Sequence, residues 1–325
     1  MTRPPRPVEP PESVRAPYEG FVRAAGVPLH VVVEGSGPVC VLSAGLAMAW
    51  FDWDPVVPLL APYRTVVRFD RPGHGLSAPA DRPPTAAGEA HRIASLLDAL
   101  GATGPVTVVG HSIAGFHTEA FARLYPERTA ALVLVDPSVE EAVPRTLLPP
   151  RLRTAAARAL GGALAAGGLP ASLGPWARRA AVRVSRTGGP DPAPRPLTHR
   201  CYRTGRVWRG ALLENARYPD MAAEVLALRG THPLTVPATV LTGYAGPDRG
   251  PALTWLGRQA ALADRLGAWF EVAEGAGHLV MLDRPHQVAR AVLSAGGPAA
   301  GCAGGPAGGS AGGPGEESEG DQLPA

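Results

Sequence analysis

Short runs of β-branched and other apolar residues alternate along most of this chain with helix-like segments, and this alternation restricts the fold more than any other feature. The runs contain almost no interleaved polar residues, which is typical of strands that are buried on both faces in a parallel sheet covered by helices. We predict strands at seven of these runs: Leu29–Val33, Val39–Leu42, Thr65–Asp70, Val106–Val109, Ala131–Asp136, Thr239–Thr242 and Trp269–Val272.

The segments between these runs have the spacing of amphipathic helices. In the segment Thr85–Leu100, apolar residues recur at i, i+3, i+4 and i+7, which gives one face that packs on the core. The residues after Pro285 have a similar apolar stripe, and proline is tolerated in a first helical turn. The sequence therefore predicts an α/β fold with a doubly wound, mostly parallel sheet.

Three stretches depart from the alternation. Residues 1–17 form a Pro-rich leader and residues 296–325 a Gly/Ala/Pro-rich tail, and we expect both to be disordered because they offer little apolar surface to bury. The region of about 138–232 is rich in Arg and in helix-forming residues. We predict it as a helical lid, inserted between two strands of one domain that spans residues 18–295.

Charge and cysteine content argue against several classes of protein. All 31 basic residues are Arg, they are scattered, and the formal net charge is only +3, so we expect no nucleic-acid partner. Cys40, Cys201 and Cys302 lie far apart and outside any Cys/His cluster, which indicates neither a disulfide framework nor a zinc site. No apolar run is long enough for a membrane span. We therefore expect a cytoplasmic protein with no membrane partner.

The segment VTVVGHSIAG, residues 106–115, joins a strand to a helix through a glycine-containing turn. A sharp strand-to-helix turn lifts its central residue, here Ser112, clear of the sheet, provided that the residues two before and two after it are small. Gly110 and Ala114 meet this requirement, although Ala114 stands where a second glycine is usual. Ser112 is therefore the predicted nucleophile, and a serine hydroxyl needs a base to act as one.

His278 is the best placed of the nine histidines to be that base. It follows the last predicted strand on a Gly-rich loop, so its imidazole can reach across the carboxyl edge of the sheet toward Ser112. His111 is adjacent to Ser112 but is expected to point elsewhere. His74 and His117 are interpreted as loop or helix-surface residues.

The same chemistry requires backbone N–H groups that hold a developing oxyanion. One should come from the residue after the nucleophile, Ile113, and one from the loop that follows the strand Val39–Leu42. By its position in the segment Ser43–Leu46, Leu46 is the expected second donor. The chain has no Lys for a phosphate-binding loop, no complete dinucleotide motif and no cluster with metal-ligand spacing, so we expect neither a cofactor nor a metal.

The chain resembles the α/β-hydrolase superfamily from about residue 20 to residue 295. Three motifs carry the resemblance in the order of the family: the loop Phe69–Ser77 after the fourth strand, the turn Gly110–Gly115, and the histidine loop Gly275–His278. Because Gly73 and Gly75 allow a tight loop beside the site, the first motif is expected to shape the site without taking part in the chemistry.

The resemblance implies a serine hydrolase acting on an ester or related acyl compound, a small-molecule substrate. Ser112 would attack the carbonyl and form an acyl-enzyme, while the N–H groups of Ile113 and Leu46 hold the oxyanion. His278 would protonate the leaving group and then activate water.

Two carboxylates are candidates for the acid that orients His278. Asp136 directly ends the strand that begins at Ala131, and some relatives carry their acid after this strand. Asp248 follows the next strand, the commoner location in the superfamily, but several residues beyond the strand end. The sequence leaves both open and favours Asp136.

Other interpretations also stay open. A serine nucleophile argues against epoxide hydrolases and haloalkane dehalogenases, because both use Asp as the nucleophile. The classes that stay possible are thioesterases, carbon–carbon bond hydrolases, acyltransferases and haloperoxidase-like enzymes. A catalytically inactive relative that binds a small ligand, and an interaction protein acting through its leader or tail, are further alternatives. The arginines of the lid are either solvent-exposed residues on its outer face or bind an anionic group of the substrate. The sequence does not indicate an oligomeric state.

Overall fold

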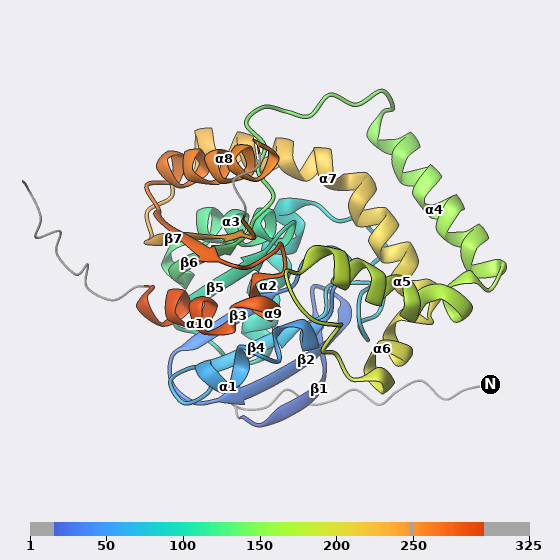
Figure 1. Cartoon of the computed structure of the whole chain (residues 1–325), viewed down its shortest axis with the longest axis horizontal. Coiled ribbons are helices and arrows are strands. Elements are labelled where there is room, and N and C mark those ends of the chain that lie inside the picture. The colour runs from blue at the N-terminus through green and yellow to red at the C-terminus, as the bar shows by residue number, and fades with distance from the viewer. Residues whose placement is uncertain (1–15, 247–249, 296–325) are drawn as a thin grey trace, which may run out of the picture.

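An eight-stranded β-sheet forms the centre of the molecule, with its strands in the order β1-β2-β4-β3-β5-β6-β7-β8. The structure, a computed structural model, describes residues 16–246 and 250–295 (Figure 1). β2 pairs antiparallel with both β1 and β4, and all other neighbouring strands are parallel. The strands are β1 (Tyr18–Ala24), β2 (Val27–Gly35), β3 (Val39–Ser43), β4 (Thr65–Phe69), β5 (Val106–His111), β6 (Thr129–Val135), β7 (Ala238–Tyr244) and β8 (Trp269–Glu274).

This sheet confirms the predicted fold class and contains all seven predicted strands. The sequence analysis missed β1, which lies at the edge of the sheet. Exposed and buried positions alternate along β1, with Glu19, Phe21 and Arg23 facing solvent. A search for uninterrupted apolar runs does not detect such a strand, because only one of its faces is buried.

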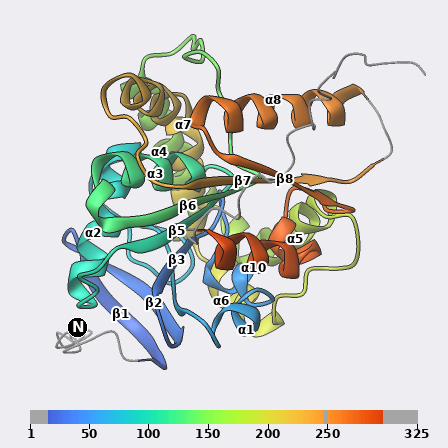
Figure 2. The ribbon, with the colours of Figure 1, turned by 90° about the vertical axis from the view of Figure 1, so that its left-hand side faces the viewer.

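Helices cover both faces of the sheet (Figure 2). α2 (Ala86–Ala99), α3 (Ala114–Leu124) and α8 (Gly250–Leu266) pack on one face, and α1 (Val57–Leu60), α9 (Val280–Asp283) and α10 (Pro285–Ser294) pack on the other. Two 3₁₀ turns, η1 (Trp50–Trp53) and η2 (Pro126–Arg128), complete these connections. The predicted helices from Thr85 and from Pro285 are thus present, and the Thr85 hydroxyl caps α2 by accepting the Gly88 N–H at 2.9 Å.

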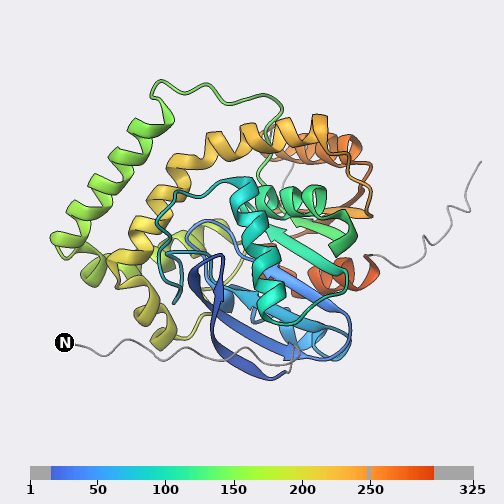
Figure 3. The same cartoon turned by 180° about the vertical axis from the view of Figure 1, so that it is seen from behind.

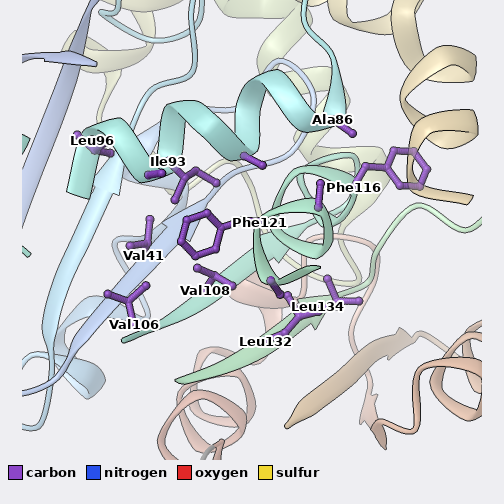
Figure 4. Packing of buried hydrophobic residues seen from close by; sticks show 14 of the residues in the cluster. Val41, Ala86, Ile93, Leu96, Val106, Val108, Phe116, Phe121, Leu132 and Leu134 are labelled. Atoms are coloured by element: carbon purple, nitrogen blue, oxygen red, sulfur yellow. The ribbon is translucent and has the colours of Figure 1, made fainter. Parts of the chain in front are cut away.

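The larger apolar core lies between the sheet and the pair α2 and α3 (Figure 4). Ile93 and Leu96 of α2 and Phe121 of α3 are buried against strand residues such as Val108 and Leu132. Burial of each such side chain stabilises the fold by roughly 1.5–3 kcal/mol. The carboxyl ends of the parallel strands, where a site is expected in this type of fold, are thereby held on a rigid base.

Four further helices are inserted between β6 and β7 (Figure 3). They are α4 (Pro150–Ala166), α5 (Leu169–Ser185), α6 (Arg195–Tyr202) and α7 (Gly205–Thr231). This segment matches the helical insertion expected at about 138–232, and we refer to α4–α7 as the lid. α7 packs on the core through Met221, Ala222 and Val225, and α4 lies on the outer side of α7.

In the described ranges no helix is both long and apolar enough to cross a membrane. Nearly all of the expected leader and the whole of the expected tail lie outside the described residues, so their predicted disorder stays a prediction.

Candidate active site

Ser112 lies at the sharp turn between β5 and α3, at the carboxyl edge of the sheet. Its backbone is in the left-handed region, with φ = 55°, which is uncommon for a residue other than glycine. A methyl group on Gly110 would lie 2.2 Å from Thr118 Oγ1, so this turn leaves no room for a side chain two residues before the serine. The steric requirement inferred for Gly110 from the sequence is thus met in the structure.

His278, in the loop between β8 and α9, reaches across the sheet edge to Ser112. The distance between His278 Nε2 and Ser112 Oγ is 3.0 Å, and that between His278 Nδ1 and Asp136 Oδ2 is 2.5 Å. Because a carboxylate only accepts hydrogen bonds, Nδ1 carries a proton in this arrangement and Nε2 is free to accept the serine proton. The structure therefore brings together the two residues that the sequence singled out first.

Asp136, the residue after β6, is buried and also has a left-handed backbone, with φ = 42°. Its Oδ1 accepts hydrogen bonds from the Gly243 N–H and from the Trp255 indole N–H, each at 3.1 Å. Both carboxylate oxygens are therefore oriented, one by these two donors and the other by His278. Asp248, the other candidate acid, lies outside the described residues.

The contact from Trp255 was not foreseen from the sequence. Trp255 belongs to α8, and the same helix supplies Gln259, whose buried side-chain amide donates to the Pro137 carbonyl at 2.8 Å. α8 thus holds the turn that carries Asp136 from two points. Only the i, i+4 spacing of these two polar groups on a helix after β7 could have suggested such a contact.

His111 also belongs to the site, although the sequence analysis expected it to point elsewhere. Its Nε2–H donates to the backbone carbonyl of His278 at 2.9 Å, and the two imidazole rings are 4.7 Å apart. Burial and the neighbouring His278 hold the pKa of His111 well below its usual range, so the ring stays neutral. His111 thereby fixes the backbone of the histidine loop.

The two expected oxyanion donors flank Ser112. Leu46 lines the same cavity as Ser112, and Ile113 begins the turn into α3. Neither of their backbone N–H groups has a hydrogen-bond acceptor within the described part of the chain. Both groups are therefore available to a ligand, as an oxyanion hole requires.

Arg71 holds the loop that carries Leu46. Its guanidinium donates to the backbone carbonyls of Ala44 and Gly45 and forms a two-pronged ion pair with Glu214 of α7, at 2.8 and 2.9 Å. Burial alone would raise the pKa of Glu214, but Arg71 and His74 hold that pKa well below its usual range. The loop Phe69–Ser77 thus shapes the site, as expected, and does so through a charged side chain tied to the lid.

Two histidines interpreted as loop or helix-surface residues are buried. His74 lies 3.3 Å from Glu214, and His117, on α3, lies with its Nε2 3.3 Å from the Met221 sulfur. His74 is in a loop, as expected, but α7 covers it, and the interpretation of His117 as a helix-surface residue was wrong because α7 packs over this face of α3. Burial, assisted by the positive charge of Arg71, lowers the pKa of His117 to about 3.

The low pKa of His117 predicts that the protein loses stability below neutral pH. An unfolded histidine takes up a proton near pH 6.5, whereas His117 in the folded state stays neutral until about pH 3, so acid favours unfolding between these values. Between pH 7 and pH 5 this residue should lower the free energy of unfolding by about 2 kcal/mol. Urea titrations at the two pH values measure this loss, and in His117→Leu the loss of unfolding free energy between pH 7 and pH 5 should be smaller by this amount. The exposed His286→Leu should change the pH dependence little, and an equal change in both variants would contradict the assignment.

A cavity of about 440 Å³ opens above Ser112 and His278. Its walls are largely apolar and come from the Leu46 loop, from α5, from α7 and from Leu279. Arg178 of α5 also lines it, but this guanidinium is occupied by Asp52, Asp191 and the Tyr202 hydroxyl. The cavity therefore offers apolar contacts, and its arginine is already neutralised.

The fold and this arrangement are those of a hydrolase, and the chain belongs to the alpha/beta hydrolase family, whose family model matches residues 29–291. This membership confirms the expectation that the protein is an enzyme of the α/β-hydrolase class.

Among curated proteins, this chain is similar to Lipase LipV from Mycobacterium tuberculosis. The two are 31% identical over 287 residues, which are 84% of this chain and 99% of LipV. A second relative is 2-hydroxy-6-oxo-6-(2'-aminophenyl)hexa-2,4-dienoic acid hydrolase from Metapseudomonas resinovorans. It is 32% identical over 127 residues, which are 38% of this chain and 44% of that protein.

Solved structures with the same fold include Cfl2 from Burkholderia cenocepacia and a thermophilic esterase from Thermogutta terrifontis. The TM-score is 0.64 for Cfl2, with 22% identity over 85% of this chain and 94% of that chain. For the esterase it is 0.62, with 22% identity over 85% of this chain and 97% of that chain. At such identities the likeness concerns the fold alone.

Proposed function

We propose that this protein is a cofactor-independent serine hydrolase that cleaves esters of apolar acyl groups. The observation that carries the proposal is the chain of contacts from Ser112 Oγ to His278 Nε2, at 3.0 Å, and from His278 Nδ1 to Asp136, at 2.5 Å, at the floor of a largely apolar cavity. The similarity to the whole length of a protein named a lipase supports an ester substrate.

In the proposed reaction, Ser112 Oγ attacks the ester carbonyl carbon while its proton passes to His278 Nε2. The N–H groups of Leu46 and Ile113 stabilise the oxyanion of the tetrahedral intermediate. His278 then returns the proton to the departing alkoxide, which leaves an acyl-enzyme. Water, deprotonated by His278, releases the acid and restores Ser112. Asp136 holds His278 in the required tautomer and stabilises its imidazolium during both acylation and deacylation.

The cavity suggests which acyl groups fit. Its α5 and α7 walls present small and apolar side chains such as Ala177, Ala181 and Leu212, and its single lining arginine, Arg178, is paired. A carboxylate on the acyl chain would have to be desolvated there without a free partner, which is costly. A neutral aliphatic chain is favoured by each methylene that it buries.

The experiment that tests this proposal combines an active-site probe with a substrate series. A fluorophosphonate should label the folded protein at Ser112 alone, as peptide mass spectrometry can establish. Across p-nitrophenyl esters from acetate to dodecanoate, kcat/KM should rise with chain length until the cavity is filled, whereas a hemisuccinate ester should react poorly. Folded protein that takes up no probe and hydrolyses no ester would instead indicate an inactive ligand-binding relative.

Arg71 is a positioning residue in this proposal, because it holds the carbonyls of Ala44 and Gly45 and so sets the direction of the Leu46 N–H. Arg71→Lys keeps the charge beside Glu214 but cannot supply the same set of planar donors. We expect it to lower kcat by about 10- to 100-fold with little change in KM. Loss of one oxyanion donor, at about 10²–10³-fold, sets the upper bound.

Arg92→Lys is the matched control for Arg71→Lys. Arg92 is a buried arginine that pairs with Glu89 and contacts no residue of the site. Steady-state kinetics and thermal unfolding of both variants should reveal a similar loss of stability but a loss of kcat only at Arg71. If kcat is unchanged in Arg71→Lys, or falls equally in both variants, Arg71 does not position the oxyanion donor.

A further inference from the structure

Positive charge is concentrated in the lid. Residues 142–213, which are the loop before α4, α4–α6 and the first part of α7, contain 13 arginines and one acidic residue, Asp191. The rest of the chain, which includes Glu214, Asp220 and Glu224 of α7, contains 18 arginines and 27 acidic residues. The small net charge of the protein therefore conceals a strongly basic lid on an acidic body. Such a separation of charge points to a partner of negative charge on the lid side.

Most of these lid arginines are exposed and have no carboxylate partner. Three of them, Arg153, Arg178 and Arg186, form ion pairs. Eight are exposed and form no ion pair with any described residue: Arg145, Arg151, Arg158, Arg183, Arg195, Arg200, Arg203 and Arg209. Their charge is therefore available to a ligand outside the protein.

The same part of the lid exposes large apolar side chains. Of thirteen exposed large hydrophobic residues in the described chain, nine lie between residues 143 and 184. They are Val143, Leu147, Leu148, Leu152, Leu160, Leu169, Leu173, Trp176 and Val184. Three of the nine lie in the loop before α4 and six lie on the consecutive helices α4 and α5. Because exposed apolar residues are ordinarily scattered singly, six of them on two neighbouring helices favour an interaction surface there.

α5 connects this surface to the cavity above Ser112. Its inner face, with Ala177, Ala181 and Ser185, lines that cavity. Its outer face carries Leu173 and Trp176, and the Trp176 side chain is 68% exposed. One helix thus separates the cavity from the exposed apolar surface.

We propose that the outer face of α4 and α5 docks on a surface of anionic lipids. Helices with arginines beside exposed Leu and Trp residues bind at the boundary between anionic headgroups and acyl chains. α4 is free to do so, because its inner face, at Thr154, Ala157 and Gly161, packs on α7 at the edge of the molecule (Figures 1 and 3).

This proposal departs from the expectation of no membrane partner, which considered only membrane-spanning segments. Docking at a surface needs no such segment. The charge of the lid also favours lipid over a second copy of the chain, because a symmetric dimer through this face would bring its unpaired arginines against one another. The proposal does not rest on the proposed hydrolysis, since Ser112 takes no part in docking.

The test is vesicle cosedimentation of the full chain. Vesicles of phosphatidylcholine with 30% phosphatidylglycerol should sediment the protein, whereas vesicles of phosphatidylcholine alone should sediment at least tenfold less. Raising the salt concentration should weaken the binding, because it screens the headgroup charge. Ser112→Ala should bind as the wild type does, so failure of docking and failure of the proposed chemistry can be told apart.

Matched variants separate the lid from the rest of the surface. Each arginine near an anionic surface contributes about fivefold, so Arg183→Gln, on α5, should weaken binding about fivefold. The control Arg265→Gln removes an exposed arginine of the body and should have little effect. Trp176→Ser should weaken binding at least tenfold, unlike Trp269→Ser, which removes a comparably exposed tryptophan, 59% exposed, from β8.

Three results would overturn the proposal. The first is sedimentation that does not depend on phosphatidylglycerol. The second is an equal loss of binding in the lid variants and their controls. The third, measured by analytical ultracentrifugation, is a dimer that Trp176→Ser dissolves, found together with no vesicle binding, because a second copy would then cover this face.

Discussion

Ser112→Ala should lower the turnover of a p-nitrophenyl ester by at least about 10³-fold while leaving the fold intact. The hydroxyl is the proposed nucleophile, and what survives its removal is the much smaller acceleration that oxyanion stabilisation and binding alone supply. Stability should change by less than about 0.5 kcal/mol, because the serine side chain is partly exposed and its hydrogen bond is to a side chain that is 40% exposed.

Three measurements check this prediction: kcat, labelling by the fluorophosphonate, and thermal unfolding. Ser138→Ala, in the loop after β6, is a suitable control because it removes a hydroxyl outside the chain of contacts to His278 and keeps the backbone N–H that donates to the Ser112 carbonyl at 3.0 Å. A Ser112→Ala variant that keeps more than about a thousandth of the wild-type turnover would show that another group is the nucleophile.

The strands could be predicted from the sequence because most of them are central and buried on both faces. Val106–His111 and Thr129–Val135 are nearly uninterrupted apolar runs that are too short for a buried helix, so they favour central strands. β1 could not be found in this way, because it is an edge strand with one solvent-exposed face, so polar and apolar residues alternate over only a few positions.

In the candidate site, the residues that could be predicted are those whose local sequence fixes their geometry. The strand–turn–helix around Ser112 and the Gly-rich loop of His278 are such local signals. Trp255 and the pair Arg71 and Glu214 act through contacts across 119 and 143 residues of chain. Such contacts depend on how α7 and α8 pack on the sheet, and no motif records them.

The burial of two histidines could not be predicted from the local sequence either. His74 and His117 have no local pattern that would mark them as core residues, and only the packing of α7 over them makes them so. A histidine on a helix or loop that another element covers is indistinguishable in sequence from an exposed one.

Asp136→Asn should lower kcat by up to about 10⁴-fold, the magnitude expected when the acid of a Ser-His-Asp triad loses its charge. The geometry supplies a reason beyond the charge. Asp136 Oδ1 accepts two N–H groups, from Gly243 and Trp255, so the carbonyl oxygen of an asparagine would take this place. Its amide N–H group would then point at His278 Nδ1, which must become an acceptor. The proton moves to Nε2, and the imidazole can no longer take the proton of Ser112.

Asp248→Asn, measured beside Asp136→Asn, decides between the two carboxylates that the sequence left open. Because Asp136 already occupies His278 Nδ1, at 2.5 Å, Asp248→Asn should stay within about threefold of the wild type. Nitrogen NMR of the histidine ring in Asp136→Asn should report a protonated Nε2 in place of a protonated Nδ1. If Asp248→Asn is crippled and Asp136→Asn is active, the acid follows β7, and the contact between Asp136 and His278 only orients the loop.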